Sequence, residues 1–114
     1  MKRGEVWLAN LNPSRGREVG KIRPALIIQS DDLGADVSHL VTILPMGSQD
    51  DRHPLLASLH YPVPARDRLL LPSLVLVDQP RTLDRTRVMD GPLTALTPAE
   101  LRAVERILRR VLGM

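Results

Sequence analysis

Apolar residues along the first 89 positions fall into short runs that alternate with polar turn segments. The runs predict β-strands near residues 4–11, 22–30, 37–46, 55–61, 68–77 and 80–89, because each is rich in the aliphatic and β-branched residues that strands favour. Clusters of Asn, Asp, Gly, Ser and Pro separate the runs, as turns require. Several short strands at this spacing predict a mainly β fold, a small antiparallel barrel.

Two runs in the second half of the chain, at residues 69–71 and 74–77, are apolar without interruption. Continuous apolar runs are typical of strands that are buried on both faces. One face would then lie in the core and the other in a contact between subunits. A short buried helix is the alternative interpretation, which Pro72 between the two runs disfavours.

The period of the pattern changes near the C-terminus, where the sequence predicts a helix. Thr97 fits the N-cap, Pro98 fits the first helical position, and Glu100 closes a capping box. Gly113 fits the C-cap. The arginines of this segment suit the negative end of the helix dipole, so we interpret them as a solvated face. The opposite, apolar face is predicted to comprise Leu101, Val104, Leu108 and Val111, widened by Ile107 and Leu112.

Composition narrows the class of protein. At 114 residues the chain is expected to form a single domain over residues 1–114. The absence of cysteine excludes disulfides, Cys-ligated zinc and thiol nucleophiles. No set of His, Asp and Glu has metal-ligand spacing, so we expect no metal and no other cofactor. The sequence has no signal peptide and no run long enough to span a bilayer, so we expect a cytoplasmic protein without a membrane partner.

A basic loop connects the first two expected strands. It carries Arg15, Arg17, Lys21 and Arg23 but only one acid, Glu18. The arginine fork binds phosphate through two parallel hydrogen bonds, so this loop can hold a polyanion. Aromatic residues make up only 2% of the chain, which argues against a protein that stacks many bases on aromatic rings.

The order of these motifs resembles the MazF/PemK family of bacterial toxin endoribonucleases. The likeness covers nearly the whole chain and is carried by the first strand and its loop, the Arg23-Pro24 pair, residues 44–49, residues 78–84 and the closing helix. The resemblance implies an SH3-like barrel of the CcdB/PemK type that forms a homodimer. It also implies cleavage of single-stranded mRNA at a short specific sequence, without metal or ribosome, and inhibition by a cognate MazE-like antitoxin.

The same resemblance assigns roles to individual residues. Arg23 falls on the family's catalytic arginine. Gly47 stands where most members have a catalytic Thr, so either the hydroxyl comes one residue further on, from Ser48, or the loop is shifted, and we expect Ser48 to supply it. Glu18 is the nearest candidate for a general base. The residues expected to bind RNA are Arg15, Arg17, Lys21, Gln49, Asp78, Gln79 and Arg81.

The chemistry of the implied reaction leaves several of these roles open. The RNA 2′-hydroxyl attacks the adjacent phosphorus, and the enzyme must stabilise charge and move protons. Arg23 suits charge stabilisation but is a poor base, because arginine keeps its proton. Glu18 is either the base or a structural partner of the loop cations, and Ser48 is either a hydrogen-bond donor to phosphate or a turn residue. Asp78 either orients Arg23, or contacts the edge of an RNA base, or only caps its own turn. His53 is either a general acid or a solvated loop residue.

Two other functions fit a barrel of this kind. One is a non-enzymatic toxin like the CcdB poisons of DNA gyrase, which depend on a C-terminal end bearing tryptophan. Here the only tryptophan is Trp7, and the chain ends Leu112-Gly113-Met114. The other is an SH3-like binding module, whose aromatic groove a chain with 2% aromatic residues cannot supply.

Overall fold

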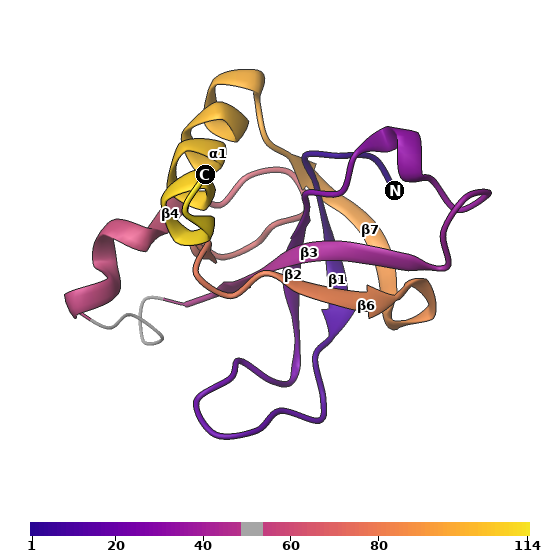
Figure 1. Cartoon of the computed structure of the whole chain (residues 1–114), viewed down its shortest axis with the longest axis horizontal. Helices are drawn as coiled ribbons and strands as arrows, with labels where there is room; N and C mark the ends of the chain where they lie inside the picture. The colour runs from indigo at the N-terminus through magenta and orange to yellow at the C-terminus, as the bar shows by residue number, and fades with distance from the viewer. Residues whose placement is uncertain (49–53) are drawn as a thin grey trace.

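The computed structural model describes residues 1–48 and 54–114 and shows a curled antiparallel sheet with a helix at its C-terminal end (Figure 1). In chain order the strands are β1 (Glu5–Asn10), β2 (Ile22–Ile27), β3 (Leu40–Gly47), β4 (His60–Val63), β5 (Ser73–Leu76), β6 (Arg81–Asp84) and β7 (Val88–Ala95), followed by the helix α1 (Pro98–Leu112). The short 3₁₀ helices η1 (Asp31–Leu33), η3 (Pro54–Leu59) and η4 (Arg85–Arg87) lie between strands. Within the described ranges, no helix combines the length and the apolar character needed to cross a bilayer. The predicted fold class, mainly β with a C-terminal helix, is confirmed.

Strand β3 organises the sheet because it pairs with three other strands. The hydrogen-bonded order is β4-β5-β3-β2-β1-β7, and β6 pairs with β3 as well. Residues 40–43 of β3 pair with β6, whereas residues 46 and 47 pair with β5. Pro45 lies between these two pairings and faces Ala25 of β2 on the other side. Proline has no N–H to donate to a ladder, so the partner of β3 changes at this residue.

Successive side chains of β2 and β3 enter two separate apolar clusters, one on each face of the sheet. Leu26 and Leu44 lie in the cluster that Val104 of α1 covers, while Ile27 and Ile43 lie in the opposite cluster. Coverage of both faces explains why these strand sequences are nearly continuous in apolar residues. The run at residues 74–77 is buried as well, with every residue at most 3% exposed. The contact between subunits that the sequence suggested is therefore not needed to bury this run.

The ends of α1 follow the local sequence signals. The backbone N–H of Glu100 donates to Thr97 Oγ1 at 3.2 Å, and the N–H of Thr97 donates to Glu100 Oε1 at 2.8 Å, so the capping box is confirmed. Gly113 closes the helix in the left-handed conformation, with a φ of 72°. Leu112 is 53% exposed, so its assignment to the apolar face is wrong. The residues that pack against the core from α1 are Leu101, Val104, Ile107 and Leu108.

Parts of three predicted strands fold differently. Residues 54–59 form η3, and β4 begins only at His60. The segment predicted at 80–89 is interrupted at Asp84, whose side chain caps η4 by accepting the N–H of Thr86 at 2.9 Å. Within the run at 69–71, Leu70 is 82% and Leu71 is 73% exposed. These two residues belong to the loop between a tight hairpin and β5. In the hairpin, the backbone groups of residues 66 and 69 bond each other at 2.9 Å, and β5 begins only at Ser73.

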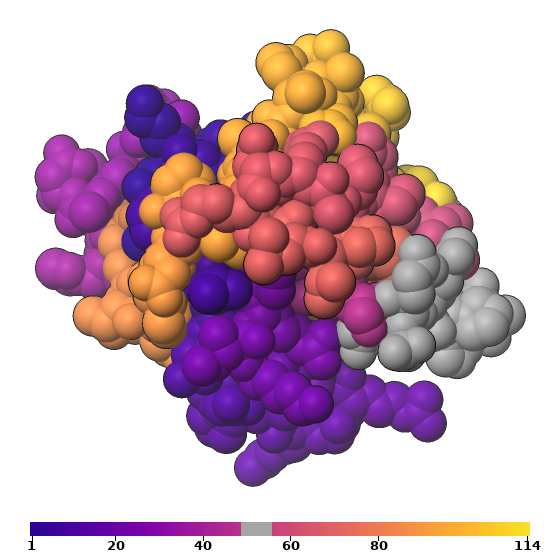
Figure 2. Space-filling view, turned by 180° about the vertical axis from the view of Figure 1, so that it is seen from behind, coloured from indigo at the N-terminus to yellow at the C-terminus, as the bar shows by residue number. Residues whose placement is uncertain are grey.

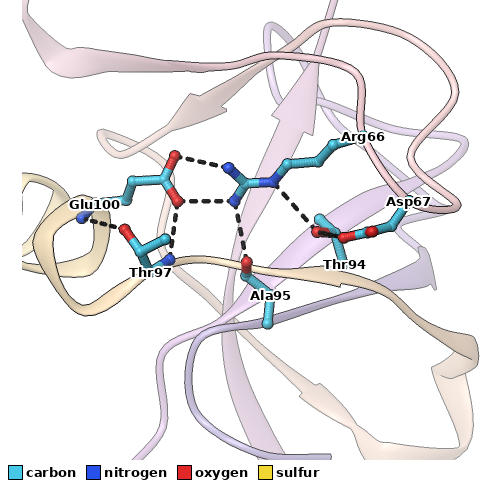
Figure 3. Close-up of polar contacts among 6 residues, drawn as sticks. All are labelled: Arg66, Asp67, Thr94, Ala95, Thr97 and Glu100. Carbon is cyan, nitrogen blue, oxygen red and sulfur yellow. Dashed lines mark hydrogen bonds and ion pairs between the residues drawn. The ribbon is translucent and has the colours of Figure 1, made fainter.

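An arginine–carboxylate pair ties the loop at residues 64–72 to the end of β7 and the start of α1 (Figure 3). Arg66 Nη1 and Nη2 donate to the two carboxylate oxygens of Glu100 at 2.9 and 2.8 Å, the bidentate geometry in which such pairs are strongest. Arg66 Nη2 also donates to the carbonyl of Ala95 at 3.0 Å, and Arg66 Nε donates to Thr94 Oγ1 at 3.2 Å. The Thr94 hydroxyl donates in turn to Asp67 Oδ2 at 2.7 Å. We call this set of contacts the Arg66 clasp.

Hydrogen bonding to Arg66 lowers the pKa of Glu100 from 4.5 to about 2, against the smaller opposing effect of burial. Because the folded-state pKa lies below the unfolded value, the ion pair stabilises the fold above pH 4.5 and loses this effect as the pH falls toward 2. We expect Glu100→Gln to lower the free energy of unfolding at pH 7 by about 1.5–3 kcal/mol, the range for hydrogen bonds to charged groups. Denaturant titrations of both proteins between pH 2 and 7 should show the difference shrinking in the acid range.

A matched control is available on the same helix. Glu105 pairs with Arg3 at 3.5 Å and is 36% exposed, so Glu105→Gln should change stability by less than about 1 kcal/mol. Equal decreases in the free energy of unfolding for the two variants would contradict a stabilising role of the Arg66 clasp. A decrease for Glu100→Gln that does not depend on pH would contradict it as well.

Candidate functional site

A cavity of about 610 Å³ lies over the face of four neighbouring strands and is walled by the loop at residues 68–73. Its floor comes from β3, β2, β1 and β7 in their order across the sheet. In the space-filling view, the salmon atoms of this loop lie between α1 and the indigo-to-purple β1–β2 hairpin (Figure 2). The floor residues are Met46, Gly47, Ser48, Arg23, Pro24, Leu8 and Leu93, and the wall residues are Arg68, Leu69, Leu70, Leu71, Pro72 and Ser73.

Two predicted catalytic residues, Arg23 and Ser48, line this same cavity. Arg23 is the second residue of β2, and its Nε donates to the carbonyl of Gly20 at 2.8 Å, which orients the guanidinium against the end of the β1–β2 loop. Ser48 directly follows β3 and is exposed. Adjacent pairing of β2 with β3 thus brings together two side chains that are 25 positions apart in the sequence.

Glu18, the third predicted catalytic residue, lies elsewhere. Its Oε1 accepts the backbone N–H of Arg15 at 2.6 Å, so the carboxylate closes a turn within the β1–β2 loop. Glu18 lines a second, smaller cavity of about 250 Å³ together with Val19, Pro45, Gln79, Pro80 and Arg81. Pro45 lines the second cavity and Met46 the first, because successive side chains of a strand point to opposite faces.

Gln79 and Arg81 hold the β1–β2 loop against the sheet. The N–H of Val19 donates to Gln79 Oε1 at 3.2 Å, and Arg81 Nη1 donates to the carbonyl of Leu11 at 2.7 Å. Arg87 Nη2 adds a contact to the carbonyl of Asn12. Two residues predicted to bind RNA therefore have structural partners in the loop that leads to Arg23.

The remaining predicted residues fall into different surroundings. Asp78 Oδ1 lies 3.3 Å from Nε2 of His60, with both side chains largely buried, and Asp78 lines neither cavity. Gln49 and His53 lie outside the described residues. The exposed cations of the loop are Arg15, Arg17 and Lys21, and they also line neither cavity.

No sequence pattern indicates Arg68 or the apolar wall beside it. Leu70 and Leu71 were predicted to lie in a buried strand, but they stand in the wall of the cavity, largely exposed to solvent. They follow a tight hairpin at residues 66–69, where Asp67 has a φ of 50°. A residue with positive φ is typical of a turn and not of a strand interior.

Two arginines, Arg23 and Arg68, and two serines, Ser48 and Ser73, thus line an otherwise mostly apolar hollow. Such a set of donors can bind a phosphate group while the apolar floor contacts the less polar parts of the same ligand. Among the described residues, no three His, Cys, Asp or Glu side chains come together in a group that could hold a metal ion.

The sequence was compared with protein families and with curated proteins. The model of a family described as "PemK-like, MazF-like toxin of type II toxin-antitoxin system" matches residues 2–112. The chain is 32% identical to "Endoribonuclease MazF" of Staphylococcus saprophyticus over 114 residues, which cover 100% of this chain and 92% of the relative.

The fold was compared with solved structures. MazF (Form-I) from Deinococcus radiodurans gives a TM-score of 0.82 at 26% identity, with 100% of this chain and 97% of that chain covered. A MazE–MazF structure (Form-III) from the same organism gives 0.75 at 27% identity, with 100% and 97% covered. Mycobacterium tuberculosis toxin MazF-mt6 gives 0.77 at 19% identity, covering 96% and 97%, which indicates a shared fold.

We expect Arg81→Ala to loosen the β1–β2 loop without unfolding the sheet. Loss of a hydrogen bond from a charged donor, worth about 1.5 kcal/mol or more, should speed local opening roughly tenfold. Hydrogen–deuterium exchange at residues 11–21 reports this opening, and Arg102→Ala, an exposed arginine on α1, is the control. Unchanged exchange in the loop of the Arg81→Ala protein would show that the contact to Leu11 does not hold it.

Proposed function

Since this chain belongs to the PemK-like, MazF-like family of toxins of type II toxin–antitoxin systems, we propose that it is an endoribonuclease that cuts single-stranded RNA. The observation that carries the proposal is the meeting of Arg23 and Ser48 on one cavity at the joined ends of β2 and β3. The name of the 32% identical relative, "Endoribonuclease MazF", supports it. We further propose that the target is mRNA, cut at a short specific sequence in the cytoplasm.

In the proposed reaction the 2′-hydroxyl of one nucleotide attacks the adjacent phosphorus, and the bond to the 5′-oxygen of the next nucleotide breaks. The 2′-hydroxyl gives up its proton as it attacks and the departing 5′-oxygen takes one up, so the products are a 2′,3′-cyclic phosphate and a 5′-hydroxyl. Arg23 stabilises the charge that develops on the phosphoryl oxygens, and Ser48 donates a hydrogen bond to the same group. This mechanism draws on side-chain donors alone, so we propose that no metal or other cofactor takes part.

The proposal assigns the general base to Glu18, the acid of the loop that leads to Arg23. The Glu18 carboxylate accepts a hydrogen bond from the N–H of Arg15, so a rearrangement of the β1–β2 loop must bring it to the 2′-hydroxyl. The same loop offers exposed cations to the RNA strand. The residues proposed to contact RNA outside the reacting group are Arg15, Arg17, Lys21, Gln49, Asp78, Gln79 and Arg81.

We expect purified protein to cut single-stranded RNA in the presence of EDTA and Arg23→Ala to be at least about 10²–10³-fold slower, the usual loss of one transition-state donor. Arg23→Lys should not restore the rate, because an ammonium lacks the planar fork. Product ends mapped by primer extension and phosphatase sensitivity measure both the rate and the chemistry. A wild-type rate in the Arg23→Ala protein would contradict the catalytic role of Arg23. RNA left intact by the wild type would favour the alternatives of a gyrase poison or a binding module.

We expect Ser48→Ala to slow cleavage by about 10²–10³-fold, because Ser48 supplies the hydroxyl that Gly47 lacks. Ser38→Ala is the control, since the Ser38 hydroxyl bonds the backbone of residue 40 within its own turn. Single-turnover rates on one RNA compare the variants directly. If Ser48→Ala and Ser38→Ala cut at the same rate, Ser48 is only a turn residue.

We propose that the protein is a homodimer whose RNA-binding groove is closed by the acidic, partly disordered tail of a MazE-like antitoxin. The solved MazE–MazF complexes support such a partner, and the Arg15, Arg17, Lys21 and Arg23 cluster would attract carboxylates as it attracts phosphates. Tail and RNA should compete, and both should bind more weakly as salt rises. Sedimentation and competition titrations check this. A monomer at micromolar concentration would contradict the dimer, and simultaneous binding would contradict the shared groove.

A further inference from the structure

The cavity contains a second guanidinium that the proposed reaction does not use. Arg68 stands in the wall formed by the loop at residues 68–73, whereas Arg23 rises from the floor on β2. The backbone N–H of Arg68 donates to the carbonyl of Leu93 at 2.9 Å, and Arg68 Nη1 lies 3.4 Å from the carbonyl of Pro92. Both contacts tie Arg68 to β7.

The sheet sets the spacing of the two arginines. Arg23 is on β2, Arg68 is tied to β7, and β1 alone lies between these strands. Neighbouring strands lie about 4.8 Å apart, so β2 and β7 are about 10 Å apart across the sheet. Two phosphates of one nucleic-acid strand can bridge such a gap.

The charge of Arg68 is not neutralised within the described part of the chain. No carboxylate there lies within 4 Å of its side-chain nitrogens. The neighbouring acid, Asp67, accepts a hydrogen bond from Thr94, and the neighbouring cation, Arg66, is paired with Glu100. Arg68 therefore keeps both its charge and most of its N–H donors for a ligand.

Apolar side chains fill the floor between the two arginines. Leu8 of β1 and Leu93 of β7 lie there, and Leu70 and Leu71 flank them in the wall. Apolar surroundings strengthen a charge-assisted hydrogen bond, because water competes less for the donor. A ribose or base that joins two phosphates would cover this surface.

We propose that Arg68 binds a second phosphate of the RNA strand, one that is not cut, while the phosphate beside Arg23 reacts. This inference rests on the proposed function and adds a substrate contact to it. Binding at Arg68 is the same before and during the reaction, so it contributes to affinity and leaves the chemical step unchanged.

The test measures binding and cleavage of one RNA by the wild type, Arg68→Ala, Arg68→Lys and the control Arg102→Ala. An RNA with a 2′-deoxy nucleotide at the cleavage position serves for binding. Arg68→Ala should raise Kd and KM about tenfold, keep kcat within about threefold, and reduce the slope of log K against log salt by about 0.7, the value for one lost phosphate contact on a single strand. Arg68→Lys should keep that slope, and Arg102→Ala should match the wild type.

A neutral methylphosphonate, placed at one linkage of the RNA at a time, identifies the phosphate. At one linkage other than the cut one, the methylphosphonate should weaken RNA binding by the wild type about as much as the Arg68→Ala substitution does. The same modified RNA should bind the Arg68→Ala protein no more weakly than unmodified RNA. Thermal unfolding of each variant separates lost binding from lost fold.

Active wild-type protein with an unchanged Kd in Arg68→Ala would overturn the inference and leave the proposed function standing. Methylphosphonates that weaken wild type and Arg68→Ala equally at every linkage would overturn it as well. If the wild type neither binds nor cuts RNA, it is the proposed function that fails.

Discussion

Arg66 is bonded to the end of β7 and to the first turn of α1, and the shape of the cavity depends on these bonds. Its guanidinium holds the carboxylate of Glu100 in the first turn of α1, the carbonyl of Ala95 at the end of β7, and the hydroxyl of Thr94 (Figure 3). Arg66 begins the hairpin from which residues 68–73 continue as the cavity wall. Glu100 also caps α1. Helix start, strand end and cavity wall are thus stabilised together, as members of one hydrogen-bond network.

The sheet supplies the second constraint, because both of its faces are buried. Pro45 and Met46 are adjacent on β3 but line different cavities. The candidate residues are divided in the same way. Arg23 and Ser48 reach the large cavity, whereas Glu18, Gln79 and Arg81 reach the small one. Gln79 and Arg81 are hydrogen-bonded to the β1–β2 loop, and this loop leads into β2 and Arg23. The two side chains therefore help to position Arg23.

Local signals account for the parts of the structure that could be predicted from the sequence. The capping box of α1 involves residues within one turn. Arg23 and Ser48 were proposed through the family resemblance, and the structure brings both to one cavity because they stand at the paired ends of β2 and β3. Leu70 and Leu71 were misplaced because an apolar run does not reveal which of its residues tertiary structure covers. Arg68 was missed for a related reason. The residues that place it on the cavity, Leu93 and the Arg66–Glu100 pair, act across 25 or more positions of the chain, and no local pattern reports such contacts.

The central claim is that RNA lies on the floor of the large cavity, against the β2, β1 and β7 face. Methyl NMR of the protein, titrated with a single-stranded RNA that carries a 2′-deoxy nucleotide at the cleavage position, tests this claim most directly. We expect large shifts at Leu8, Met46 and Leu93, which line the cavity, and small shifts at Val41 and Leu83, which lie in the opposite apolar cluster. Shifts confined to α1 or to the opposite cluster, with the cavity methyl groups unchanged at saturating RNA, would contradict it.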